Sequence, residues 1–432
     1  MTSRLQTAVM CLSLFGCGHA PPPAAQQAKP ERDRVCYRGT QTLTGHFELP
    51  GQTLPLEMQL ELFAHAYVVS TWSADAPHDV EREQVWLEPT RVIQASADAP
   101  VAEASEWETT WARKLARLAE TTQAAPHPTF GDVVERVQPG ELTWLDGLSA
   151  PGTLSLAHAT ESTRWTAELA RERCSDAATL SNKPVVPPLK AAEPPVTWTQ
   201  LEAGVELAIL HGSQIVSLVV ELSHALLVCE TGLTVRQGEQ LLDALAERFP
   251  HKPVAHVLFG HHHPHYTGGL RAFIAAGAVI HAPLHNARFV EQLAALPFEL
   301  APDRLARNKL APRIEAFEGR FVLQDEGRVV VEAIDIGSES NHTQEYVLAY
   351  LPKHKLLFEG DLGWSVGPTG EIRASRRAHG LLHAIAVHGL AVERIVQSWP
   401  LMGAKQTIEP SALQAAVEAR EATALAPRPG ET

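Results

Sequence analysis

Apolar and polar residues alternate along much of the first half of the chain, and this alternation predicts strands. Between residues 34 and 175, the run from Leu56 to Leu62 is one of several with an apolar side chain at every second position. Large apolar residues near 104–121 recur at helical spacing instead. We therefore expect a β-rich N-terminal domain over residues 34–175, in which no catalytic constellation stands out.

The second half has a different pattern, in which short apolar strands alternate with helical segments. Residues 176–196 are rich in proline and predict an interdomain linker. Beyond the linker, Val254 to Phe259 is an apolar strand, and Phe321 to Ile336 has the pattern of a hairpin. An α/β domain with mixed sheets is therefore expected over residues 197–424, followed by a disordered tail over residues 425–432.

The first 33 residues predict export of the protein. Arg4 precedes an apolar stretch that is too short to span a bilayer as a helix, and LFGC, ending at Cys17, resembles a bacterial lipobox. We expect residues 1–17 to be a lipoprotein signal peptide with lipidation at Cys17, and residues 18–33 to be a flexible tether. A plain signal peptide that ends near a cysteine is the alternative. The expected location is the extracytoplasmic side of the bacterial cell envelope, periplasmic or at the outer membrane, with a lipid anchor as the only membrane attachment.

Charge and cysteine use add two expectations. The formal net charge is −14, and an acidic surface repels phosphate, so nucleic acid is not expected as a partner. A small-molecule substrate is the expected partner, and the oligomeric state is not predicted. Cys36 and Cys174 flank the N-terminal domain and are expected to form a disulfide in an oxidising compartment. Cys229 lies in an apolar run and is expected to be a buried free thiol.

Four histidines within five positions follow the strand that ends at Phe259. In an extended loop, His261 and His263 project to the same side, so their imidazoles can bind one metal ion. A catalytic zinc site needs three protein ligands and an open position for water. His342, on a later loop between two strands, is the best candidate for the third ligand. Asp361, at another strand end, can add a carboxylate.

The sequence around these residues resembles the signature of the metallo-β-lactamase superfamily. GHHHPHYTGG (residues 260–269) is similar to its motif T-H-x-H-x-D-H-x-G-G, and residues 342–343 are similar to its later His-Thr element. Residues 351–361 are similar to the strand pair that ends in its metal-bridging Asp. The resemblance covers about residues 198–410 in the family's order. It implies a four-layer αββα sandwich, with two facing sheets and helices outside, and a metal-dependent hydrolase.

The resemblance implies a complete first metal site, made of the three imidazoles named above, and an altered second one. The bridging Asp is kept as Asp361, but His265 replaces the motif Asp and Tyr266 replaces the adjacent His. Met402 stands where a late His is expected. A phenol with a pKa of about 10 and a soft thioether suit zinc poorly. We therefore expect one strongly bound zinc, with a second zinc weak or absent and only His265 and Asp361 as good ligands for it.

A single zinc still gives hydroxide at neutral pH, which would attack an ester, thioester, amide or similar bond of a small molecule. The residues expected to act in catalysis are His265, which would orient or deprotonate the water, Tyr266, which would donate to an oxyanion, and Asp361. His262 is expected to be solvated or to support a metal ligand without touching the metal. Other histidines, such as His281, are expected to be surface or core residues.

The alternative function is a catalytically impaired metal-binding lipoprotein of the envelope, acting as a binding or scaffolding protein. It follows from the replacement of second-site ligands, because metal activation is the only catalytic device that the sequence offers.

Overall fold

The computed structural model describes residues 34–44, 53–63, 66–73, 76–87, 92–96, 102–103, 112–113, 115, 117–118, 120–127, 129–145, 148–159, 164–174, 195–211, 213–366, 369–398 and 405–425. The predicted signal peptide with Cys17, the tether, most of the linker, Met402 and most of the predicted tail lie outside these residues. The chain divides into two compact units. The first is Met1–Ala191 with Pro297–Ala301, and the second is Ala192–Leu296 with Pro302–Thr432.

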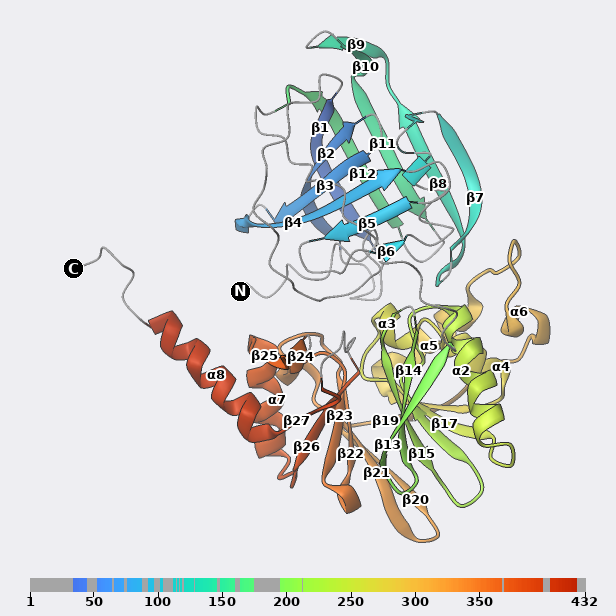
Figure 1. The fold of residues 1–432 in the computed structure, drawn as a ribbon. Helices are drawn as coiled ribbons and strands as arrows, with labels where there is room; N and C mark the ends of the chain where they lie inside the picture. Colours follow the sequence, from blue (N-terminus) through green and yellow to red (C-terminus); the bar gives the residue numbers. More distant parts are fainter. Residues whose placement is uncertain are drawn as a thin grey trace. The chain divides into compact units, whose positions relative to one another are not determined.

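The first unit is built on one ten-stranded antiparallel sheet (Figure 1). The strand order is β6-β5-β4-β3-β2-β1-β12-β11-β8-β7, so the first and last strands of the unit pair in the middle of the sheet. The strands are β1 (Val35–Thr44), β2 (Thr53–Phe63), β3 (Ala66–Ser73), β4 (Ala76–Leu87), β5 (Val92–Ser96), β6 (Ala102–Glu103), β7 (Thr121–His127), β8 (Gly131–Pro139), β11 (Thr153–Ala159) and β12 (Arg164–Glu172). A separate hairpin pairs β9 (Leu142–Leu145) with β10 (Leu148–Pro151). The predicted β-rich character of this region is confirmed.

The apolar positions of the alternating runs form the core of this sheet. Met58 and Leu60 in β2 are fully buried together with Trp165 in β12. Ala112 and Leu115, from the described helical residues between 112 and 117, complete the same cluster. An alternating pattern thus produces a sheet with one buried face, which the helical residues cover.

A disulfide joins Cys36 in β1 to Cys174, two residues past the end of β12, with their Cα atoms 5.3 Å apart. The two strands pair along the whole of β12, and Cys36 lies opposite Glu172, so the strand pairing itself brings the two cysteines together. Cys229, in the second unit, is a buried free thiol as predicted.

Two sheets form the centre of the second unit. The first has seven strands in chain order: β13 (Val196–Glu202), β14 (Val205–Leu210), β15 (Val216–Glu221), β16 (Leu226–Cys229), β17 (Val254–Leu258), β18 (Val279–Pro283) and β19 (Arg313–Phe317). The second has six, in the order β20 (Arg320–Asp325), β21 (Arg328–Asp335), β22 (Val347–Leu351), β23 (Leu356–Glu359), β26 (Arg394–Gln397) and β27 (Thr407–Ile408). A short hairpin pairs β24 (Trp364–Val366) with β25 (Glu371–Arg373). Both sheets mix parallel and antiparallel pairs, as the sequence predicts.

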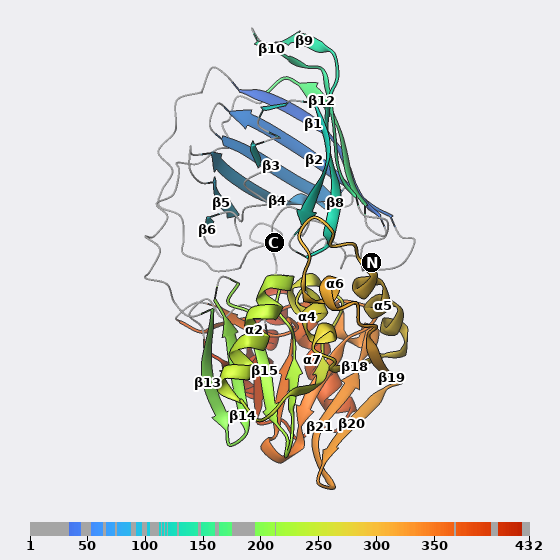
Figure 2. The ribbon, with the colours of Figure 1, turned by 90° about the vertical axis from the view of Figure 1, so that its right-hand side faces the viewer.

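Helices flank both sheets. Figure 2 shows α2 (Val235–Arg248) and α4 (Leu270–Ala275) in front of the first sheet, with α5 (Ala287–Ala295) beside them. On the side of the second sheet lie α7 (Arg376–Val387) and α8 (Pro410–Leu425) (Figure 1). The short helices are α3 (Pro264–Thr267), α6 (Arg304–Asn308), η2 (Leu284–Asn286), η3 (Gly337–Ser340) and η4 (Pro352–His354).

Apolar side chains pack in two layers of this unit. Leu218 and Cys229 from the first sheet share one buried cluster with Val331 and Phe358 from the second, so the two sheets face each other. A further cluster packs helices α7 and α8 against the outer face of the second sheet. The predicted four-layer αββα arrangement is therefore confirmed.

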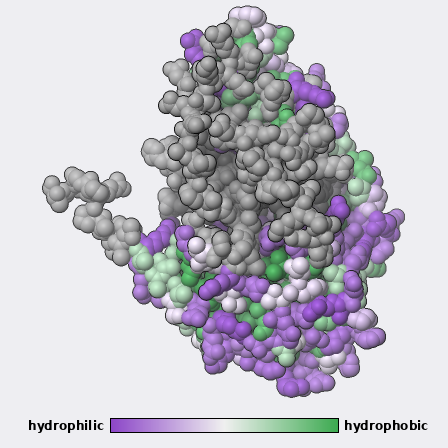
Figure 3. Space-filling view, viewed as in Figure 1, coloured by the Kyte–Doolittle hydropathy of each residue, from purple (hydrophilic) through white to green (hydrophobic). Residues whose placement is uncertain are grey.

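The described surface of the second unit carries mainly hydrophilic side chains on the face shown in Figure 3. Among the described residues, no helix is both long and apolar enough to cross a membrane.

Candidate metal centre

The histidine cluster lies on the loop that leaves strand β17 and enters the short helix α3. The N–H of Gly260 donates to Glu230 Oε1 (2.9 Å), and its carbonyl accepts from the N–H of Val347 (2.6 Å), which begins a strand of the second sheet. The hydroxyl of Thr267 donates to two carbonyls of the loop at 3.1 Å. Both sheets therefore hold the loop in place.

Glycines allow helices α2 and α4 to approach closely behind this loop. A Cβ on Gly269 would lie 2.1 Å from the carbonyl oxygen of Thr231, and one on Gly238 would lie 2.3 Å from the carbonyl oxygen of Gly269. Only glycine fits such a backbone approach. Thr231 in turn donates its N–H and its hydroxyl to the carbonyl of Tyr266 (2.9 and 2.8 Å). A Cβ on Gly268 would lie 1.8 Å from the carbonyl oxygen of Leu233, so both glycines at the end of the motif have a packing role.

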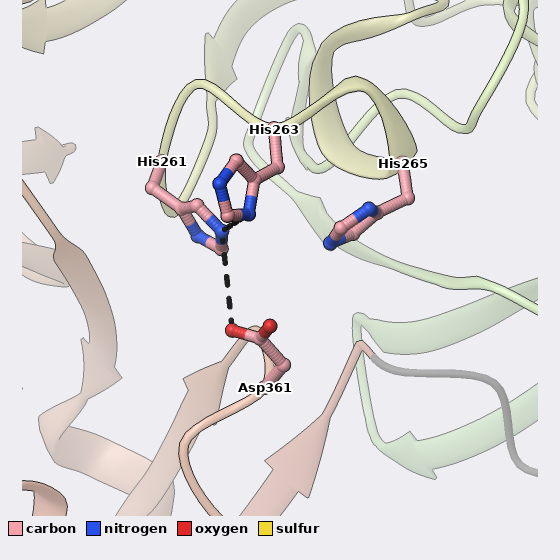
Figure 4. A group of neighbouring side chains, drawn as sticks. All are labelled: His261, His263, His265 and Asp361. Atoms are coloured by element: carbon pink, nitrogen blue, oxygen red, sulfur yellow. Dashed lines mark hydrogen bonds and ion pairs between the residues drawn. The ribbon is translucent and has the colours of Figure 1, made fainter. Parts of the chain in front are cut away.

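Four metal-binding side chains converge at the end of the loop (Figure 4). One ligand atom from each of His261, His263, His265 and Asp361 lies within 4.8 Å of the others, and all four residues are buried. The Nε2 atom of His261 lies 2.7 Å from Nδ1 of His263 and 3.9 Å from Oδ1 of Asp361. Three imidazoles from one side thus face a carboxylate from the end of β23.

His342 lies beside this group but is not one of its four members. Its ring centroid is 4.8 Å from those of both His261 and His263, and its Nε2 lies 3.3 Å from Oδ2 of Asp361. A tight turn after η3 directs it there. Asn341 adopts a left-handed conformation (φ 55°), and the hydroxyl of Ser340 accepts from the N–H of His342 (3.2 Å).

Asp361 is the most heavily contacted of the candidate ligands. The hydroxyl of Tyr346 donates to its Oδ1 (3.2 Å) and accepts from the N–H groups of Gly360 (3.1 Å) and Asp361 itself (2.9 Å). The guanidinium of Arg377 donates through Nη1 to Oδ2 (2.8 Å). One tyrosine and one arginine therefore fix both oxygens of this carboxylate.

Burial and charge set the protonation of the cluster. Burial holds the pKa of His261 and His263 well below the ordinary value and lowers the pKa of His265 to about 3. Burial alone would raise the pKa of Asp361, but the nearby His342, Arg377 and His261 bring it well below its usual range. Neutral imidazoles beside an ionised carboxylate are the forms that bind a metal ion.

Two further carboxyl groups lie buried on the two loops that carry these residues. Glu230 accepts from Gly260 N–H, and Glu359 accepts from Leu362 N–H (2.7 Å), immediately after Asp361. Burial raises the pKa of both well above the ordinary value. One oxygen of each has no hydrogen-bond partner among the described residues. Protonated carboxyl groups thus hold the loops without adding charge beside Asp361.

Tyr266 and His262 are also enclosed by protein. Tyr266 is fully buried, and burial raises the pKa of its hydroxyl well above the ordinary value, so the phenol stays neutral. A Cβ on Gly360 would lie 3.1 Å from its Cζ. His262 is buried rather than solvated, and its Nδ1 hydrogen-bonds to the carboxyl of Glu345.

The donor set fits a metal ion. Nε2 of His261 and Nδ1 of His263 lie 2.7 Å apart, as in a hydrogen bond between two neutral imidazoles, and burial keeps both rings in the neutral form that binds a metal ion. Nδ1 of His261 is buried with no hydrogen-bond partner among the described residues. Imidazole nitrogens with one carboxylate oxygen are typical ligands of zinc. His261, His263 and His342, the predicted ligands, would hold the ion and leave one position for water, with His265 and Asp361 beside them.

The sequence predicts some members of this site and misses others. The structure brings together all of the predicted metal ligands, although His342 lies outside the tightest group. No role was predicted for Tyr346, Arg377, Glu230 or Glu359. The sequence carries a signal for the two glutamates, because each is a charged residue at the end of an apolar strand segment. Arg377 had none, because α7 begins well after the strand end that carries Asp361.

No protein-family model and no curated protein matches the sequence. Among solved structures, the chain is similar to the metallo-β-lactamase FIM-1 from Pseudomonas aeruginosa in its mono-zinc form (19% identity, 54% of this chain and 97% of that chain, TM-score 0.38). It is similar to a metallo-β-lactamase from Pontibacter korlensis (18% identity, 52% and 99%, TM-score 0.38). A third similar structure is TMB-1 (17% identity, 54% and 100%, TM-score 0.37).

At these identities the similarity concerns the fold alone. The resemblance to the metallo-β-lactamase superfamily is confirmed at that level, because the described sheets and helices have the four-layer arrangement that it implies. The second unit is a four-layer αββα sandwich with a His/Asp cluster that could hold a metal ion.

Proposed function

We propose that the second unit is a zinc-dependent hydrolase that cleaves an ester, thioester, amide or similar bond of a small molecule. The observation that carries the proposal is the buried convergence of three imidazoles and one carboxylate within 4.8 Å. Zinc held there would lower the pKa of a bound water to about 7. Asp361 and the neutral ring of His265 would orient that water and accept its proton when His261, His263 and His342 hold the zinc, as predicted from the sequence.

The test combines metal analysis with hydrolysis of a panel of chromogenic esters, thioesters and amides. Purified protein is expected to retain zinc through dialysis, and chelation should abolish turnover. His263→Ala should remove the metal and the activity together. A matched control is His251→Ala, which changes an exposed histidine of the same unit and should leave both unchanged.

Two results would contradict the proposal. Folded protein that binds no zinc when zinc is supplied would exclude both the hydrolase and the metal site. Stoichiometric zinc with no turnover on the panel would leave the site standing and favour the alternative, a non-catalytic metal-binding protein.

We also propose that Cys17 anchors the protein in the cell envelope through lipid, as the lipobox-like LFGC suggests. Cys17→Ser should release the protein from the membrane fraction of an expressing bacterium. Wild-type protein that never incorporates labelled fatty acid would contradict this.

A further inference from the structure

Arg377 lies against Asp361, the candidate metal ligand that follows β23. Its Nη1 donates to Oδ2 of Asp361 at 2.8 Å and lies 3.4 Å from the backbone carbonyl oxygen of the same residue. Oδ1 faces the other way, towards His261 Nε2 (3.9 Å) and the hydroxyl of Tyr346 (3.2 Å). Oδ2 also lies 3.3 Å from Nε2 of His342, so the guanidinium and His342 share this oxygen, whereas Oδ1 faces His261.

The guanidinium is held in place by the packing of its helix. Arg377 is the second residue of α7, which begins at the N-cap Ser375, whose hydroxyl accepts from Ala378 N–H. A Cβ on Gly380 would lie 2.4 Å from the carbonyl oxygen of Glu339, so α7 packs directly on η3. The Nδ2 atom of Asn341 donates to the carbonyl of Arg376 (3.1 Å). The turn that carries His342 and the helix that carries Arg377 thus form one packed unit.

The side chain of Arg377 is also largely buried, at 14% exposure, beside an aspartate at 4%. A buried guanidinium is a permanent positive charge, because arginine is not deprotonated in proteins. A divalent ion that used Oδ2 of Asp361 would have to share that oxygen with this charge, and the two positive charges would repel each other at short range.

We propose that Arg377 takes the place of a second metal ion, so that the site holds one divalent ion beside a fixed guanidinium on Oδ2 of Asp361. This inference rests on the proposed metal site. It explains how the negative charge of Asp361 is balanced by a cation, although Tyr266, a neutral phenol, replaces the imidazole that would help to bind a second metal ion. It also gives the site a positive group that can face an anionic part of the substrate.

The test is zinc titration of metal-free protein by calorimetry, repeated with cobalt(II) followed by its visible absorption. Wild type should bind one equivalent tightly. Arg377→Gln keeps an N–H donor but removes the charge, and should bind a second equivalent at least about 10-fold more tightly than wild type does. Arg377→Lys keeps the charge and should bind only one. The matched control is Arg376→Gln, which removes the neighbouring exposed charge and should behave as wild type.

Folding of each variant is checked by circular dichroism, and Arg377→Leu is a second charge-removing variant should the glutamine variant not fold. Wild type with two tight ions would overturn the inference while leaving the metal site intact. One ion in both Arg377→Gln and Arg377→Leu would also overturn it, as would a second ion in Arg377→Lys. Wild type without any zinc would refute the proposed function itself, which separates the two failures.

Discussion

His281 makes the stability of the second unit depend on pH. It lies in β18 with 1% exposure and stacks on Phe321 of the second sheet, with ring centroids 4.2 Å apart. Its Nε2 lies 2.9 Å from Nδ1 of His256, and its Nδ1 lies 3.2 Å from the carboxylate of Glu315. Burial, with a smaller effect of His256, lowers the pKa of His281 from 6.5 to about 4.

This shift fixes both the direction and the size of the effect. Below pH 6.5 the unfolded chain takes up a proton on His281 that the folded protein does not. Stability therefore falls as the pH drops from 6.5 towards 4, and the loss reaches about 3 kcal/mol at 1.36 kcal/mol per pKa unit. From about one pH unit above 6.5 the group is neutral in both states and contributes no slope.

The perturbation is His281→Leu, which removes the titrating ring and keeps an apolar side chain. Urea unfolding is measured between pH 4 and pH 7.5 by pulsed hydrogen exchange and mass spectrometry of peptides from β17 and β18, so that the second unit is observed by itself. Between pH 7.5 and pH 4, the unfolding free energy of the variant should fall by about 3 kcal/mol less than that of wild type. His285→Leu, at a half-exposed histidine, is the control and should follow wild type. Parallel curves for wild type and His281→Leu would refute the reasoning.

Three other predictions concern separate parts of the chain. Replacing both Cys36 and Cys174 with Ser removes a disulfide that joins residues 138 positions apart. In the chain-entropy model this should lower the unfolding free energy of the first unit by about 5 kcal/mol, which calorimetry measures. A loss below about 1 kcal/mol would contradict the prediction. Tyr346→Phe removes the hydroxyl that contacts Asp361 and should weaken zinc binding by about 10–100-fold. Competition with a chelating dye measures the affinity, and an unchanged value would show that the hydroxyl is dispensable. Gly269→Ala forces a Cβ to within 2.1 Å of a backbone oxygen and should destabilise the second unit by about 1–3 kcal/mol or more in urea, and a variant as stable as wild type would disprove the close approach.

Local patterns were sufficient to predict individual strands and helices of the second unit, whereas its four-layer arrangement was predicted only from the family resemblance. The apolar strand before the histidine cluster and the hairpin around residues 325–327 appear as β17 and as the β20–β21 pair. These features depend on the alternation of apolar residues and on turn chemistry within a few positions, which a single sequence records. The ten-stranded order of the first unit is different, because β1 pairs with β12 across more than a hundred residues. No local signal specifies such a pairing.

The same distinction applies to the residues of the site, some of which belong to short sequence motifs while others are brought in by tertiary packing. His261, His263 and His265 come from one short motif, and Asp361 from a recognisable strand end. Arg377 reaches Asp361 only because α7 packs on the turn that carries His342, and that packing depends on a glycine in the helix and on tertiary contacts. The sequence predicted a weak second metal site from the ligands that are missing. It could not predict a cation supplied by the protein itself.

The charges of the buried cluster agree with a single divalent ion. Asp361 is the ionised carboxylate at its centre, whereas burial raises the pKa of Glu230 and Glu359 well above the ordinary range and keeps them protonated. Arg377 already balances the single negative charge of Asp361. Little negative charge then remains to attract a second ion, even before the missing imidazoles are considered. A first ion bound by neutral histidines keeps most of its positive charge, and a more positive metal is the better acid for a bound water. The same charge arrangement that disfavours a second metal therefore favours water activation at the first.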